Sequence, residues 1–130
     1  MGVYTNGLSF GIAYAVGEVD LGRSLESMVD ITSANAAKIC GMYPKKGAIA
    51  AGSDADIAII DPSIDRPLTL DDLHLEDYSI WEGWHVHGWP TTTILRGKVM
   101  VQDGSLLGSA GDGNLLNRSI DPAVGRRPVC

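Results

Sequence analysis

Two histidines, His85 and His87, stand two positions apart in the chain. On a strand, side chains at positions i and i+2 point to the same face, as a pair of metal-ligating imidazoles requires. The third histidine, His74, and the carboxylates of Asp77 and Glu82 are the nearby groups that could complete such a site. The same spacing is also typical of a polar pair on a loop or an edge strand, and we expect this second interpretation to hold. We therefore predict no metal ligand in this chain.

Aromatic side chains gather around the two histidines: Tyr78, Trp81, Trp84 and Trp89. Such a group can stack a flat ring or a sugar. More often it buries a large apolar area between layers of structure or at a contact between subunits. We expect these aromatic side chains to pack rather than to bind a ring, and a contact between subunits is the functional role that such packing could have.

Three aspartates, Asp54, Asp56 and Asp61, could form a carboxylate cluster. The segment lacks the glycine and the distal glutamate of a calcium loop, so roles in turns and at strand ends suffice. Cys40 lies within a helical pattern with no histidine near it in sequence, and it is expected to be a small core residue rather than a nucleophile.

The first third of the chain is expected to be helical. Residues 8–16 are small and apolar and favour a short buried helix. Ser24 is a good N-cap for a second helix. A further helix start is predicted at Thr32 and Ser33, and Gly41 is expected to end that helix. The pattern therefore predicts two short helices in tandem after Ser24.

The middle of the chain is expected to be rich in strands. Residues 56–60 form a β-branched run that predicts a largely buried strand stopped by Pro62. Residues 66–70 are a candidate for another short strand. Residues 91–95 and 98–101 predict two strands joined by a tight hairpin turn. Helices followed by strands favour an α+β fold.

Composition narrows the class of protein. The chain has 130 residues, a net charge of −6 and 45% hydrophobic residues. This is typical of a globular protein, and the acidic balance argues against nucleic acid, which needs a clustered positive field. No apolar run approaches the ~20 residues that cross a bilayer, and the first residues lack the basic region of a signal peptide. Two cysteines give no disulfide framework, so a cytoplasmic location is expected.

The order of several motifs is more specific than any of them alone. It comprises residues 33–47 (SANAAKICGMYPKKG), 49–57 (IAAGSDADI), 78–83 (YSIWEG), 86–90 (VHGWP), 94–99 (ILRGKV) and 103–104 (DG). This series resembles the segment of amidohydrolase-superfamily enzymes in which the last barrel helix leads into a small β domain. The narrower similarity is to the hydantoinase, dihydropyrimidinase and allantoinase group.

The resemblance implies a fold and a division of the chain. Residues 1–44 would be the last helices of a metal-dependent (β/α)₈ hydrolase barrel. Residues 45–107 would be the C-terminal strands of a small β-sandwich domain, and residues 108–130 a C-terminal arm. The α+β chain would then be a fragment of the parent enzyme.

The resemblance also implies the chemistry of that parent. Family members hold zinc or another divalent metal with a His-x-His pair on the first barrel strand, a carboxylated lysine, two further histidines and an aspartate. The metals activate a hydroxide that attacks the ring amide carbonyl. All of these ligands would lie upstream of the matched segment. We therefore expect no catalytic residue and no bound metal in this chain.

Asn6, followed by Gly7, is the one candidate substrate contact that the resemblance suggests. Family members carry an Asn-Gly after the last barrel strand whose backbone groups hydrogen-bond the cyclic amide. Here the spacing to Gly22 and Arg23 is short, a proline is missing in front, and Asn-Gly is also a common turn.

These observations predict part of a hydrolase acting on C–N bonds of hydantoin-type or dihydropyrimidine-type rings, inactive as the chain alone. One alternative is a non-catalytic scaffold of the same family, and another is an independent metal-binding module at His85 and His87. The substrate would be a cyclic amide or ureide, with no nucleic acid or membrane as partner. Unpaired strand edges and apolar faces lead us to expect a homo-oligomer.

Overall fold

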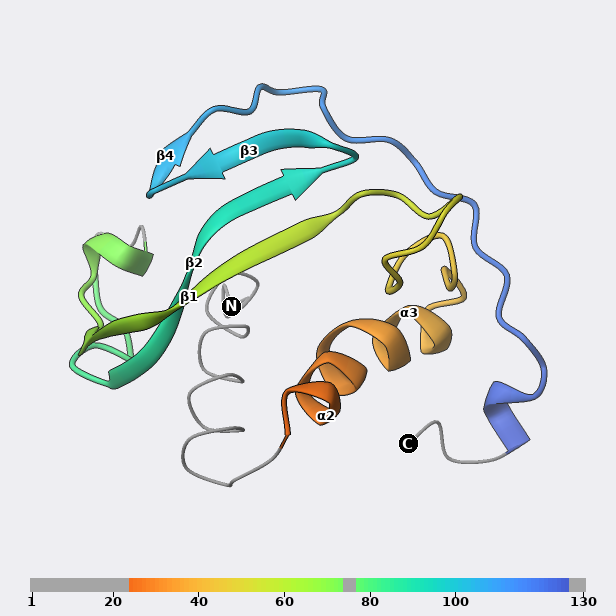
Figure 1. Ribbon diagram of the computed structural model, residues 1–130, viewed down its shortest axis with the longest axis horizontal. Helices are drawn as coiled ribbons and strands as arrows, with labels where there is room; N and C mark the ends of the chain where they lie inside the picture. Colours follow the sequence, from red (N-terminus) through yellow and green to blue (C-terminus); the bar gives the residue numbers. More distant parts are fainter. Residues whose placement is uncertain (1–23, 74–76, 127–130) are drawn as a thin grey trace.

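The computed structural model describes residues 24–73 and 77–126 of the chain. The helical part comes first: α2 (Leu25–Val29), a π-helical stretch (Asp30–Ala34) and α3 (Asn35–Ile39). The strands that follow are β1 (Ile57–Pro67), β2 (His85–Leu95), β3 (Lys98–Gln102) and β4 (Ser105–Leu106), with 3₁₀ turns at Asp71–Leu73 and Val124–Arg126. The strands form one antiparallel sheet in the order β1-β2-β3-β4, with the helices to one side of it (Figure 1). The predicted α+β class is confirmed.

The helical segment begins where the sequence indicates. Ser24 is extended, and its side chain accepts a hydrogen bond from the backbone N–H of Ser27 at 3.3 Å. Gly41 ends the segment with φ +69°, a conformation that favours glycine. The prediction of two separate helices is wrong, because Thr32 does not start a new one. Its hydroxyl donates to the carbonyl of Met28 at 2.7 Å, inside a helix that continues through a π turn.

The loop after α3 is fixed to both the helix and the sheet. Gly47 lies so close to the helix that an added Cβ would be 2.6 Å from the Cβ of Ala37. Asp54 forms ion pairs with Lys45 and Lys46 at 2.6 and 2.8 Å. These contacts give Asp54 the turn role that the sequence predicts, and the two ammonium groups lower the pKa of its carboxyl.

Asp56 connects this loop to the hairpin between β2 and β3. Its carboxylate pairs with Lys46 and accepts a hydrogen bond from the backbone N–H of Arg96 at 2.8 Å. Arg96 and Gly97 both have positive φ, which is the backbone of a two-residue type I′ turn. The predicted hairpin is therefore confirmed.

Strand β1 does not stop at Pro62, contrary to the prediction. It continues to Pro67 through an irregularity in the pairing with β2 between Asp61 and Asp65. Proline is tolerated there because β1 is an edge strand and the ladder is interrupted at this point. Asp61 accepts hydrogen bonds from the backbone and the hydroxyl of Ser63, at 2.8 and 2.6 Å, which holds the irregular segment. The separate strand predicted for residues 66–70 is likewise wrong, because its first two residues end β1.

The C-terminal arm returns to the helical segment. It runs from β4 along the outside of the sheet to the end of α3 (Figure 1), where the N–H of Ser119 donates to the carbonyl of Gly41 at 2.9 Å. Near its start, both carboxylate oxygens of Asp112 lie 2.9 Å from Nζ of Lys98. This ammonium group and the N–H of Ser109 hold the pKa of Asp112 at about 2.

Few apolar side chains of the described residues are buried. The buried ones are Met28, Ala37, Leu68 and Val86. The strand 56–60, predicted to be largely buried, is not: Ile59 is 48% exposed. Large hydrophobic residues exposed elsewhere include Leu25, Val29, Ile31, Ile39, Tyr43, Ile49, Tyr78, Ile80, Trp84, Leu106, Leu107, Leu115 and Ile120. Within the described ranges, no helix has the length and apolar character to cross a membrane.

Candidate functional site

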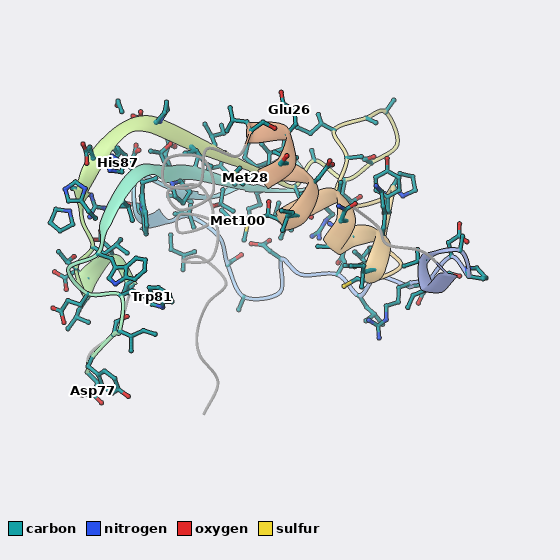
Figure 2. The ribbon with its side chains drawn as sticks, turned by 90° about the horizontal axis from the view of Figure 1, so that it is seen from below. Glu26, Met28, Asp77, Trp81, His87 and Met100 are labelled. Carbon is teal, nitrogen blue, oxygen red and sulfur yellow. The ribbon has the colours of Figure 1, made fainter. Side chains whose placement is uncertain are left out.

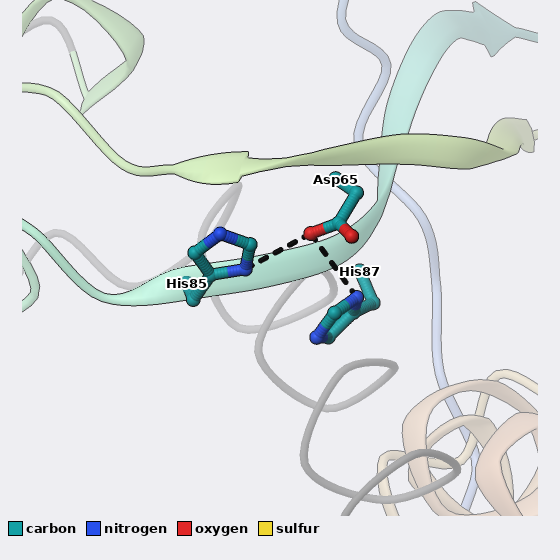
Figure 3. Close-up of side chains that lie close together, drawn as sticks. All are labelled: Asp65, His85 and His87. Atoms are coloured by element: carbon teal, nitrogen blue, oxygen red, sulfur yellow. Dashed lines mark ion pairs between the residues drawn. The ribbon is translucent and has the colours of Figure 1, made fainter.

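Asp65, His85 and His87 form a compact cluster on the paired strands β1 and β2 (Figure 3). Oδ1 of Asp65 lies 2.9 Å from Nδ1 of His85 and 3.2 Å from Nδ1 of His87. One potential ligand atom from each side chain lies within 4.8 Å of the other two. The three side chains are 43–56% exposed, so the cluster is open to solvent.

The register of the two strands explains how the three side chains meet. Asp65 is directly opposite His87, and His85 is the next residue of β2 on the same face. From the pair Asp61–Trp89 to the pair Asp65–His87, β1 advances by four residues (65 − 61) and β2 by two (89 − 87). The two extra residues of β1 therefore decide that Asp65, rather than Ser63, faces the histidines.

The sequence indicated the two histidines but missed their carboxylate partner. The acidic residues considered beside them, Asp77 and Glu82, are not in the cluster, and His74 lies outside the described residues. The sequence favoured a polar pair on a loop or edge strand over a metal site at these histidines. Asp65 converges with them as a third candidate ligand, so the expectation of no metal ligand in this chain is revised.

A second polar group lies at the same end of the β1–β2 pair, where the end of β1 meets the start of β2. The guanidinium of Arg66 donates to both carboxylate oxygens of Asp72, at 2.6 and 2.7 Å, and lies 5.6 Å from the ring centroid of Trp89. Thr69 donates to the same carboxylate through its N–H and its hydroxyl. The bonds from Arg66 are the main reason that the pKa of Asp72 is lowered to about 2.

Replacement of Asp72 by asparagine is expected to lower the free energy of unfolding at neutral pH by about 1 kcal/mol, a figure kept small because Arg66 is partly exposed. The stabilisation is fully present above the ordinary pKa of 3.8 and is lost as pH falls toward the folded value of about 2. The difference between wild type and variant should therefore shrink over that window. Urea unfolding followed by tryptophan fluorescence measures it, and Asp71→Asn, at the exposed neighbouring position, is the control. A difference that stays constant down to about pH 2 would contradict this assignment.

Two of the four aromatic residues, Trp81 and Trp89, pack as predicted, whereas Tyr78 and Trp84 are 62% and 46% exposed. Trp81 and Trp89 contact the buried pair Leu68 and Val86. Trp81 also meets Trp84 edge to face, with ring centroids 4.8 Å apart and planes at 85°. Trp81 and His87 lie at the end of the β1–β2 pair that is remote from the helices (Figure 2).

Two other candidate residues have no described role in this cluster. Cys40, at the end of α3, is a free cysteine and is half-buried rather than part of the core. Asn6, the candidate substrate contact, lies outside the described residues, and its role stays a prediction.

The cluster does not match the hydrolytic centre that the resemblance implies. That centre needs a lysine, four histidines and an aspartate converging in a barrel, whereas residues 24–73 and 77–126 bring together one set of three candidate ligands, on a sheet.

Comparison with known proteins gives a consistent result. The profile of the Amidohydrolase family matches residues 5–100. A D-hydantoinase of Ralstonia pickettii is 45% identical over 102 residues, which are 77% of this chain and 22% of that protein. A dihydropyrimidinase of Rattus norvegicus is 46% identical over 91 residues, 69% of this chain and 18% of that protein.

The fold agrees with the sequence. The solved D-hydantoinase from Bacillus sp. AR9 superposes with a TM-score of 0.79 at 42% identity, covering 85% of this chain and 25% of that one. The chain thus spans about a fifth to a quarter of the length of the relatives it matches. By the profile that covers most of its length, and by these relatives, the chain belongs to the amidohydrolase family.

Proposed function

We propose that this chain is the C-terminal part of a metal-dependent hydrolase that opens the ring of a cyclic amide, of the hydantoin or dihydropyrimidine type. The 45% identity to a protein named D-hydantoinase, together with the fold likeness, carries the proposal. The relatives compared above carry the names of hydrolases, which favours an enzyme over a non-catalytic scaffold. The divalent metal, zinc or another, would be held by residues upstream of the matched segment.

We also propose how the chain divides within the parent. Residues 1–44 would end the catalytic barrel, residues 45–107 would complete the small β-sandwich domain, and residues 108–130 would form an arm. The continuous helical segment and the four-stranded meander support this division.

The exposed apolar residues support the view that other parts of a larger protein cover this chain. On the helical segment, Leu25, Val29, Ile31 and Ile39 are 46–54% exposed. A helix that is apolar on more than one face is normally packed on both sides. The barrel of the parent would cover one apolar face of this helical segment. In the isolated chain, self-association would cover it instead. A homo-oligomeric parent is proposed on the same ground.

A chimera tests the proposed activity. The segment of the Ralstonia pickettii D-hydantoinase that matches this chain is replaced by the chain itself, and ring opening of hydantoin is followed with zinc present. We expect the chimera to hydrolyse hydantoin, while the 130-residue chain alone shows nothing above background. The relative truncated before the segment, which lacks its β-domain strands, is the control and should be inactive.

The same chimera tests the proposed role of Asn6. Asn6→Pro, which removes the backbone N–H, should raise KM for hydantoin more than it lowers kcat, because the contact is made by the backbone to the bound ring. Asn114→Pro, at an exposed position of the C-terminal arm, should change neither. A folded, metal-loaded chimera with no hydrolysis would contradict the proposed function. Hydrolysis by the chain alone would contradict the placing of the metal ligands upstream.

A further inference from the structure

We propose that Asp65, His85 and His87 form a binding site for a divalent transition metal ion, represented here by zinc. The site needs only side chains of this chain and is separate from the hydrolytic centre proposed for the parent. Its success or failure therefore does not bear on the proposed hydrolase.

The spacing of the ligand atoms suits such an ion. Zinc binds nitrogen and oxygen ligands at about 2.0–2.2 Å, which places neighbouring ligand atoms of a tetrahedral site about 3.3 Å apart. Oδ1 of Asp65 lies at 2.9 and 3.2 Å from the two Nδ1 atoms, close to that separation. The imidazole rings are tilted by 47° to each other, with centroids 5.3 Å apart. Small rotations of exposed side chains would bring all three ligand atoms around one ion.

The strands hold the ligands in place before any metal arrives. His85 and His87 share one face of β2 because they are two residues apart, and Asp65 is opposite His87 on β1. Val86 between them is 1% exposed and is part of the hydrophobic cluster, so the backbone carrying the histidines is anchored. A site on paired strands therefore loses less conformational entropy on binding than one on a loop.

The donor set selects the class of metal. Two imidazole nitrogens and one carboxylate oxygen suit zinc, copper(II) or nickel(II), whereas magnesium and calcium prefer oxygen ligands alone. Three protein ligands leave a further coordination position, which solvent can reach because the side chains are 43–56% exposed.

The location suggests what a bound ion does. Asp65 belongs to β1 and the histidines to β2, at the point where pairing resumes after the irregularity at residues 61–65. An ion there joins the two strands across an interrupted ladder. Binding to the folded form alone raises the apparent stability of the chain in proportion to the logarithm of the zinc concentration.

The test is isothermal titration of the 130-residue chain with zinc chloride in chelator-free buffer, beside thermal unfolding with and without zinc. We expect a single zinc ion per chain and a raised unfolding temperature. His87→Ala and Asp65→Asn should each weaken zinc binding about tenfold or more, and magnesium should give no binding heat.

Matched controls separate this site from adventitious zinc. Glu82→Gln removes a neighbouring exposed carboxylate outside the cluster, and His74→Ala removes the remaining histidine; both should bind zinc as wild type does. Asparagine keeps the shape of Asp65, so its loss of zinc binding with an unchanged circular dichroism spectrum reports the ligand and not the fold. Absence of zinc binding by the wild type, or equal zinc affinity in His87→Ala, would overturn the proposal.

Discussion

Alanine in place of Gly47 is expected to destabilise the chain by about 2–4 kcal/mol, through a left-handed backbone and an overpacked contact together. Gly47 has φ +77°, a conformation that costs energy for a residue with a Cβ. An added methyl group would also stand 2.6 Å from Cβ of Ala37 and 2.9 Å from the carbonyl oxygen of Ser33. Ala37 is 5% exposed and Ser33 contributes backbone, so neither can rotate away. The loop would have to move off the helix.

Gly52→Ala is the matched control for this prediction. Gly52 also has positive φ, at +91°, but nothing lies within 4 Å of an added Cβ. It should therefore show the backbone cost alone, about 1–2 kcal/mol. Urea unfolding monitored by circular dichroism measures both variants. If the two alanine variants lose the same stability, the close contact between Gly47 and the helix is wrong.

Features that depend on neighbouring residues could be predicted from the sequence. Ser24 caps a helix through its own hydroxyl, and Gly41 ends one because its backbone is left-handed. The hairpin at Arg96 and Gly97 likewise follows from local turn chemistry. In each case the deciding interaction lies within a few residues, so the pattern alone is sufficient.

Two features were predicted wrongly, one for a local reason and one because of a distant contact. Thr32 looks like a helix start because its hydroxyl can cap, but here the hydroxyl bonds one turn back and the helix continues. Pro62 looks like a strand end, yet β1 accommodates it at an irregular, edge position. At Pro62 local propensity was overruled by the pairing with β2, which the sequence does not display.

The candidate metal cluster combines both situations. The spacing of His85 and His87 is visible in the sequence, and its geometrical meaning follows from strand alternation. Asp65 lies twenty residues upstream, and its position depends on the two extra residues that β1 accommodates before it. A regular register would have placed Ser63 opposite His87, and serine is not an expected ligand for this set. The third ligand could be found only from the register itself.

Leu68→Ala is expected to lower the free energy of unfolding by about 3 kcal/mol. The substitution leaves a cavity in the small hydrophobic cluster where the end of β1 meets the start of β2. Leu68 is 1% exposed and packs with Val86 against the partly buried Trp81 and Trp89. Its backbone bonds with Trp84 and Gly83, at 2.8 and 2.9 Å, are independent of the side chain and should persist. The loss should therefore come from packing and not from refolding of the loop.

The three tryptophans of the chain, Trp81, Trp84 and Trp89, provide the measurement. Two of them, Trp81 and Trp89, contact the hydrophobic cluster. Urea unfolding followed by tryptophan fluorescence therefore reports directly on the packing around Leu68. The matched control is Leu115→Ala, the same truncation at a side chain that is 95% exposed, which should change stability by less than about 0.5 kcal/mol. Equal effects at the two leucines would mean that Leu68 and Val86 do not form a core, and that the strands carrying Asp65, His85 and His87 are held by hydrogen bonds alone.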